Sequence, residues 1–205
     1  MGELLDSYYM KKFTFEQYEQ RIKDYYLHLD QHVDIWEIGN EINGEWLGEK
    51  NLVIKKMLLA FDYFHSKNKI TAITFYYNKG CYAHPEHEMF HWIKENVPNR
   101  MKQKLDYVFI SYYEEDCNNQ KPDWDNVFFK LGTVFPNSKL GFGEVGTSDP
   151  LKKPDYIKRY YGIQIDHPRF IGGYFWWYFY QDMVITNKEY LKVLKTTILK
   201  KSLSN

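Results

Sequence analysis

Strand-like segments recur along this chain at nearly even intervals, and this spacing constrains the fold more than any other feature of the sequence. Short runs rich in β-branched and aromatic residues begin near residues 33, 70, 107, 139 and 171, and the last of them is expected to form a strand over 170–179. A repeat of about 32–37 residues is the size of a strand–helix unit whose successive strands lie parallel. The runs are continuously apolar, as in sheets covered on both faces. We therefore expect an α/β fold.

The segments between these runs carry helical patterns. Thr14 opens the first with Gln17 three residues later, the spacing of a capping box. Further helices are expected over 51–67, from Pro85 onward, over 123–135 and 154–165, and after Asn187 as the cap of a last helix. Residues 1–13 show no pattern, and no linker or change in composition divides the chain. We expect a single domain over residues 1–205.

Composition excludes some partners. Lys and Arg number 27 and Asp and Glu also number 27, so no basic excess points to nucleic acid or to an anionic membrane surface. No apolar run is long enough to span a bilayer, and the first residues do not read as a signal peptide. Aromatic residues make up 19% of the chain, which suits both a large core and a site that stacks against sugar rings.

The two cysteines, Cys81 and Cys117, fall just beyond the expected ends of neighbouring strands. A disulfide between two adjacent loops would imply an oxidising compartment, and two free thiols are the equal alternative. No CxxC pair is present, so a structural zinc site made of cysteines is not expected.

Chemically useful side chains stand at the carboxyl ends of the expected strands, where parallel α/β barrels gather their active sites. Two carboxyl groups at one rim suit the hydrolysis of a glycoside, in which one protonates the leaving oxygen and the other attacks the anomeric carbon. A tyrosine can hold one carboxylate ionised, and an indole can carry the apolar face of a sugar. These strand-end residues are Asn40, Glu41, Asn78, Tyr112, Tyr113, Glu144, Trp176 and Trp177.

Four of these segments resemble strand motifs of one family. The stretch Trp36-Glu37-Ile38-Gly39-Asn40-Glu41 resembles the fourth-strand motif of the retaining glycoside hydrolase clan of (β/α)8 barrels, which includes many cellulases, mannanases and galactanases. Gly141-Phe142-Gly143-Glu144-Val145-Gly146 resembles its seventh-strand nucleophile motif. Residues 111–113 and 173–177 resemble its sixth and eighth strands. The resemblance implies a partial TIM barrel made of strands four to eight with their helices.

The resemblance also implies residue roles. Glu41 would be the acid/base and Glu144 the nucleophile, and Asn40 would bind the sugar 2-hydroxyl. Tyr113 would donate a hydrogen bond to Glu144, with Tyr112 as the alternative. The remaining substrate-binding candidates are Trp177 as the floor of the sugar site, Trp176 as its alternative, Asn78 at the rim, and the loop residues Glu45, Trp46 and Asp182. The implied substrate is an oligo- or polysaccharide, with no cofactor and no metal.

The resemblance leaves out the first three strands of such a barrel, and 205 residues are few for a complete one. The favoured expectation is a fragment whose N-terminal half-barrel lies in a longer protein, extracellular or secreted. The alternatives are strands supplied by another chain, as in a homo-oligomer that covers the open sheet edges, or an inactive, truncated half-barrel that only binds carbohydrate.

A competing motif is His87-Glu88-Met89-Phe90-His91, which matches the H-E-x-x-H signature of zinc metalloproteases. On one helix, two histidines a turn apart can bind zinc while the glutamate serves as base. Lys94 stands where the extended form of the motif has glycine. The alternative is that these residues simply begin the helix expected after Pro85.

Overall fold

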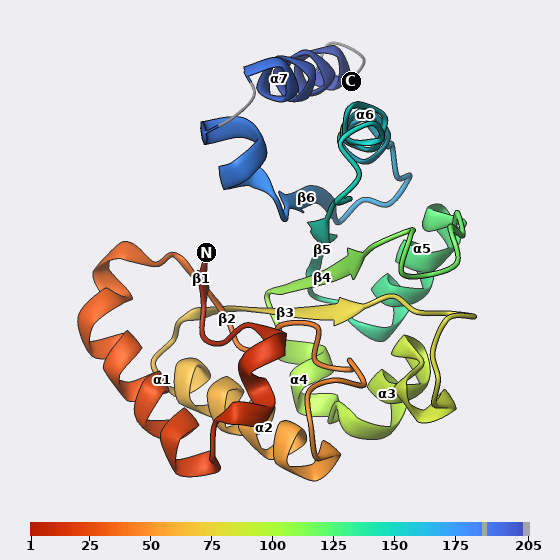
Figure 1. Cartoon of the computed structure of the whole chain (residues 1–205). Coiled ribbons are helices and arrows are strands. Elements are labelled where there is room, and N and C mark those ends of the chain that lie inside the picture. Colours follow the sequence, from red (N-terminus) through yellow and green to blue (C-terminus); the bar gives the residue numbers. More distant parts are fainter. Residues whose placement is uncertain (186–187, 203–205) are drawn as a thin grey trace.

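The computed structural model describes residues 1–185 and 188–202 of the chain. The fold is α/β, and its strands form one parallel sheet in the order β1-β2-β3-β4-β5-β6 (Figure 1). Their bounds are Gly2–Glu3 (β1), Ile35–Glu37 (β2), Ile70–Tyr76 (β3), Tyr107–Tyr112 (β4), Lys139–Val145 (β5) and Phe170–Trp176 (β6).

The expectation of five strands was wrong, because the described chain has a sixth at its beginning. In β1, Gly2 pairs with Trp36 and Glu3 with Glu37 of β2, in the same parallel sense as the rest of the sheet. A strand of two residues is too short to show periodicity. It therefore gave no signal within residues 1–13.

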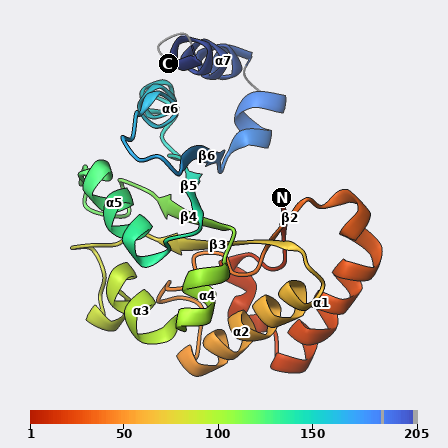
Figure 2. The same ribbon diagram turned by 180° about the vertical axis from the view of Figure 1, so that it is seen from behind.

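The sheet curls into a half-barrel with its helices on the outer side. Figure 1 shows α1 to α4 packed below β1 to β4, while α6 and α7 lie above β5 and β6, and Figure 2 shows the same arrangement from behind. The two end strands, β1 and β6, each have one neighbour in the sheet. This shape is compatible with part of a TIM barrel and leaves the concave side open between the end strands.

The helices follow the predicted segments with several changes in their bounds. The α-helices are α1 (Phe15–Leu29), α2 (Lys50–Ser66), α3 (Met89–Asn96), α4 (Asn99–Lys104), α5 (Trp124–Val134), α6 (Lys153–Gly162) and α7 (Lys188–Ser202). Short 3-10 helices cover Ser7–Lys12 (η1), Asp30–His32 (η2) and Pro85–His87 (η3), and a π-helix covers Tyr180–Ile185 (η4). The capping box of α1 between Thr14 and Gln17 is confirmed. The predicted cap Asn187 lies outside the described residues.

Two predicted elements were wrong in extent. The helix expected from Pro85 is divided into η3, α3 and α4; α3 ends before Pro98 because the residue that precedes a proline disfavours helical backbone. The strand expected over 170–179 ends at Trp176, where a turn leads into the π-helix. Among the described residues, no helix is long and apolar enough to cross a bilayer.

Many of the aromatic residues fill the core between the sheet and the helices. Trp36 of β2 stacks on Phe64 of α2 with 4.7 Å between ring centroids. On the other side, Phe142 of β5 contacts the rings of Trp124 and Phe128 from α5. These contacts fix the outer faces of β2 and β5, the two strands that position the glutamates described below.

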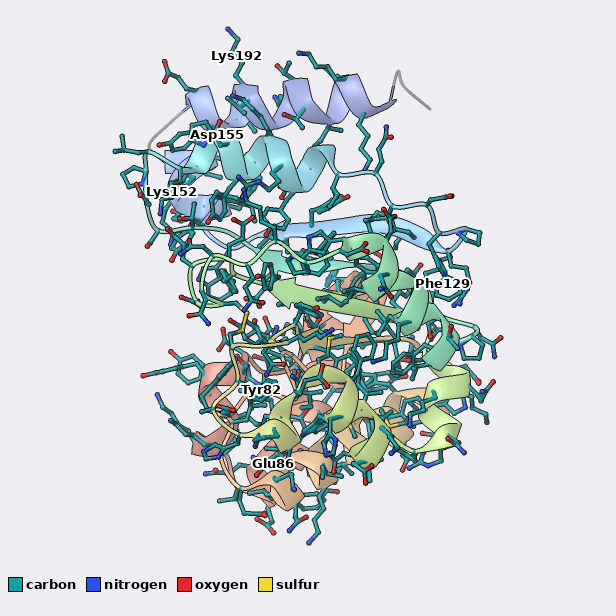
Figure 3. All side chains as sticks on the ribbon, turned by 90° about the vertical axis from the view of Figure 1, so that its right-hand side faces the viewer. Tyr82, Glu86, Phe129, Lys152, Asp155 and Lys192 are labelled. Carbon is teal, nitrogen blue, oxygen red and sulfur yellow. A yellow bond between two sulfur atoms is a disulfide. The ribbon has the colours of Figure 1, made fainter. Side chains whose placement is uncertain are left out.

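Cys81 and Cys117 form a disulfide that joins the loops after β3 and β4; Figure 3 shows a disulfide bond in yellow near the labelled Tyr82. Of the two alternatives left open by the sequence, the paired one is therefore found. The bridge closes a sequence separation of 36 residues.

We expect replacement of both cysteines by serine to lower the free energy of unfolding by about 3–4 kcal/mol, because the loop no longer restricts the unfolded chain. Urea unfolding of the oxidised protein and of the double variant measures the difference. Equal midpoints for the two proteins, with equal slopes, would contradict this prediction.

Candidate active site

The two predicted catalytic glutamates lie at the same end of the sheet and line one cavity. Glu41 follows β2, and Glu144 is the next-to-last residue of β5. The cavity has a volume of about 440 Å³. Its lining residues are Asp6, Ser7, Tyr8, Tyr9, Glu41, Tyr113, Asp116, Glu144, Trp177 and Tyr178.

The backbone of Glu41 adopts a conformation that side-chain-bearing residues rarely take. Ladder hydrogen bonds continue past β2, from the Thr74 N–H to the Gly39 carbonyl at 2.8 Å, and the chain then turns with the Gly44 N–H donating to the Glu41 carbonyl at 2.8 Å. At this turn Glu41 has φ 45°, in the left-handed region. Such strain is concentrated at functional sites, because the surrounding structure must hold it in place.

Glu41 is buried and has few hydrogen-bond partners. The residue is 6% exposed, and the Ser7 hydroxyl donates to its Oε2 at 3.0 Å. Its Oε1 is buried with no hydrogen-bond partner among the described residues. Burial, and secondarily the nearby charge of Glu144, raise the pKa of Glu41 well above its usual value. Glu41 therefore holds a proton more readily than an ordinary glutamate.

Glu144 has a donor on each carboxylate oxygen. Asn40 Nδ2 donates to Oε1 at 2.9 Å, and Tyr113 Oη donates to Oε2 at 2.8 Å, as the sequence analysis predicted for Tyr113. Burial raises the pKa of Glu144, but both donated hydrogen bonds oppose that rise because they favour the ionised form. Of the two glutamates, Glu144 is thus the better carboxylate and Glu41 the better acid.

A second cavity of about 480 Å³ lies against the first. Tyr8, Glu41, Tyr113 and Asp116 line both. The other residues around the second cavity are Glu45, Trp46, Tyr76, Asn78, Cys81 and Tyr82. Glu41 therefore stands between two cavities, and Glu144 lines only the first.

The structure brings most of the predicted residues together. Asn40 and Tyr113 both donate to Glu144, and Glu41 lines the same cavity as Glu144. Trp177 also lines this first cavity, with 47% of its surface exposed. Glu45 and Trp46 line the second cavity.

Three predicted binding residues lie elsewhere. Tyr112 is fully buried, and its hydroxyl donates to the Gln120 carbonyl at 2.8 Å, because alternate strand residues face opposite sides of the sheet. Trp176 is buried and donates through Nε1 to Asp182 at 2.8 Å. Asp182 is itself buried in a 2.5 Å ion pair with Lys153. Tyr112, Trp176 and Asp182 are therefore structural.

Asn78 lies at the rim of the second cavity, but its side-chain amide is hydrogen-bonded to the main chain. Its Nδ2 donates to the His87 carbonyl at 2.9 Å, and its Oδ1 accepts from the Met89 N–H at 3.0 Å. Its role as a sugar ligand is therefore weakened, and the side chain instead holds the loop between β3 and α3.

The H-E-x-x-H segment lacks the continuous helix that zinc binding requires. His87 ends η3, and Glu88 is the N-cap of α3, where its carboxylate accepts from the His91 N–H at 2.8 Å. The His87 ring Nδ1 is hydrogen-bonded to the Asn43 carbonyl at 2.8 Å. Among the described residues, no group of three His, Cys, Asp or Glu side chains is placed to hold a metal ion. The motif is explained as the start of a helix.

Part of the site comes from the first residues of the chain, which carry no motif that predicts it. Asp6, Ser7, Tyr8 and Tyr9 all line the first cavity, although residues 1–13 carry no periodic pattern. Asp116 and Tyr178 were missed as well, because they follow strand ends at positions that no motif marks. The one usable signal is composition, since three of the missed residues, Tyr8, Tyr9 and Tyr178, are tyrosines in a chain that has 19 of them.

Comparison with known proteins gives no family for this chain. Neither protein-family models nor curated proteins match its sequence.

Proposed function

We propose that the chain is a retaining glycoside hydrolase that cleaves β-glycosidic bonds with Glu41 as acid/base and Glu144 as nucleophile. The observation that carries this proposal is that a buried glutamate, Glu41, and a half-buried one, Glu144, line one cavity with opposite hydrogen-bond surroundings. Glu144 accepts two hydrogen bonds that favour its charge, while Glu41 accepts one and keeps its other oxygen unpaired among the described residues. Retaining hydrolysis needs one ionised and one protonated carboxyl group.

In the proposed first step, the Glu144 carboxylate attacks the anomeric carbon while Glu41 gives its proton to the departing glycosidic oxygen. The bond to the leaving group breaks as the glycosyl ester to Glu144 forms. In the second step Glu41, now ionised, takes a proton from water, and the resulting oxygen nucleophile displaces Glu144. The proton returns to Glu41 and the free sugar keeps its original anomeric configuration.

The proposed substrate is an oligo- or polysaccharide of uncharged sugars. Trp177 lines the first cavity and Trp46 the second, and Glu41 lines both; aromatic faces suit the apolar faces of sugar rings. Among the described residues, the two linings contain five carboxyl groups and no Lys or Arg: Asp6, Glu41, Glu45, Asp116 and Glu144. Acidic sugars would meet like charge here.

A panel of 4-nitrophenyl β-glycosides of glucose, mannose, galactose, xylose and glucuronic acid tests the proposal with wild type and Glu144→Gln. We expect release of 4-nitrophenol from at least one uncharged glycoside by wild type only, and none from the glucuronide. The second candidate is a carbohydrate-binding half-barrel, which the two end strands with single neighbours favour. No turnover by either protein, with oligosaccharide binding retained in calorimetry, would support that candidate and overturn the enzyme.

Tyr113→Phe is expected to lower kcat/KM by about 10- to 100-fold, the usual range for one hydrogen bond to a charged group. Loss of the hydroxyl raises the pKa of Glu144, so the acid limb of the pH–kcat/KM profile moves to higher pH. The matched control is Tyr112→Phe, whose hydroxyl meets a backbone carbonyl outside the site. An acid limb that stays in place in Tyr113→Phe, or moves equally in both variants, would refute the assignment.

A further inference from the structure

Ser7 is hydrogen-bonded both to Glu41 and to Asn40, the residue that donates to Glu144. Its hydroxyl donates to Glu41 Oε2 at 3.0 Å, and its main-chain N–H donates to Asn40 Oδ1 at 3.0 Å. Asn40 in turn donates to Glu144. A third contact, from Trp46 Nε1 to Ser7 Oγ at 3.0 Å, fixes the hydroxyl as acceptor on one side and donor on the other.

Side chains of α1 and α2 hold the segment that carries Ser7 in place through hydrogen bonds to its main-chain carbonyls. The buried ammonium group of Lys56 in α2 donates to the Met10 carbonyl at 2.8 Å and to the Phe13 carbonyl at 2.5 Å. Arg21 of α1 donates to the Leu4 carbonyl at 2.5 Å. Ser7 is itself 6% exposed. The three hydrogen bonds of Ser7 are therefore made by a buried residue in a segment that contacts with α1 and α2 hold in place.

We propose that Ser7 is a positioning residue for the two glutamates: its hydroxyl orients Glu41, and its main-chain N–H orients Asn40 against Glu144. This inference deepens the proposed glycosidase function and rests on it for its kinetic consequences. Of these two contacts, only the one from the hydroxyl to Glu41 depends on the side chain of residue 7. A substitution at position 7 should therefore affect Glu41 and leave the main-chain contact that supports Glu144 in place.

The direction of the effect follows from the donor. The Ser7 hydroxyl favours the ionised form of Glu41, so its removal moves the titration of Glu41 to higher pH. The Ser7 N–H remains, so the titration of Glu144 is expected to stay in place. The ionisable groups that face or surround Glu41 are unchanged by the substitution: Asp6, Glu37, Glu45, Tyr8, Tyr76, Tyr113, Asp116 and Glu144.

The test compares Ser7→Ala, Ser7→Thr and wild type by carboxyl carbon NMR titration, with the Glu41 signal assigned through Glu41→Gln. We expect the Glu41 titration to move to higher pH in Ser7→Ala and to return to the wild-type position in Ser7→Thr, which keeps a hydroxyl. In turnover, Ser7→Ala is expected to lose about five- to tenfold in kcat at the optimum, the range for one hydrogen bond. Its alkaline limb should move upward while its acid limb stays fixed.

Ser66→Ala is the matched control, because the hydroxyl of this exposed serine donates to the Tyr63 carbonyl of its own helix. Should Ser7→Ala fail to fold, Trp46→Phe is the second variant, because it removes the donor to Ser7 Oγ. It is expected to move the titration of Glu41 to higher pH by a smaller amount. An unmoved Glu41 titration in the folded variant would overturn the role of Ser7. A moved titration in a protein without turnover would keep that role and reject the glycosidase.

Discussion

Glu144→Gln is expected to lower kcat by roughly 10⁴-fold, the loss seen when a catalytic carboxylate is replaced by the amide of the same shape. The amide has the shape of the carboxylate but cannot attack the anomeric carbon. Steady-state assay on the best aryl glycoside measures the loss. Residual activity within tenfold of wild type would show that another group is the nucleophile.

The amide also creates a local conflict that the experiment must separate from catalysis. Asn40 and Tyr113 both donate to Glu144, so the amide nitrogen of glutamine would face a donor. Glu144→Ala removes this conflict and is expected to lose activity to the same extent. Circular dichroism of both variants checks that the fold is kept.

Glu41→Gln is expected to reduce turnover in a way that depends on the leaving group. For glycosides with a poor leaving group, such as methyl glycosides or disaccharides, kcat/KM should fall by roughly 10²- to 10⁴-fold, the range for general acid catalysis. A 2,4-dinitrophenolate departs without a proton, so the glycosylation step with that substrate should be nearly unaffected. The alkaline limb of the pH profile, which reports loss of the Glu41 proton, should disappear.

The control for this prediction is Glu37→Gln. Glu37 is a second buried glutamate, and burial raises its pKa to about 7, but it accepts a hydrogen bond from Thr74 within the sheet and lines neither cavity. Any change in kcat/KM in Glu37→Gln should be the same for good and poor leaving groups. Equal losses for good and poor leaving groups in Glu41→Gln would contradict its role as the acid.

The sequence predicted the sheet because periodic runs of buried residues leave a strong pattern. The strands from β2 to β6 begin close to their expected positions, and Asn40, Glu41 and Glu144 fall at strand ends where a parallel sheet gathers them. Tyr113 could be chosen over Tyr112 only by resemblance, because the two are adjacent at the end of the same strand: Tyr112 is the last residue of β4 and Tyr113 follows it. The side of the sheet that each residue faces depends on the register, which shifts between Ile110 and Tyr112.

The parts that escaped prediction are those without periodicity. The two-residue strand β1 and the 3-10 helix η1 hold their places through contacts with distant residues, such as Ser7 with Trp46 and Lys56 with Met10. Local propensity carries no record of such contacts. The break between η3 and α3 likewise depends on Glu88 acting as a cap, which the H-E-x-x-H pattern concealed.

The most direct test of the central claim is covalent trapping with 2,4-dinitrophenyl 2-deoxy-2-fluoro-β-glycosides of glucose, mannose, galactose and xylose. The fluorine slows hydrolysis of the ester more than its formation when the leaving group is this good. Mass spectrometry of intact and digested protein is expected to show one added fluoroglycosyl group on Glu144 in wild type and none in Glu144→Gln. A group attached to a different residue, or turnover of the parent glycosides with inverted configuration, would contradict the account.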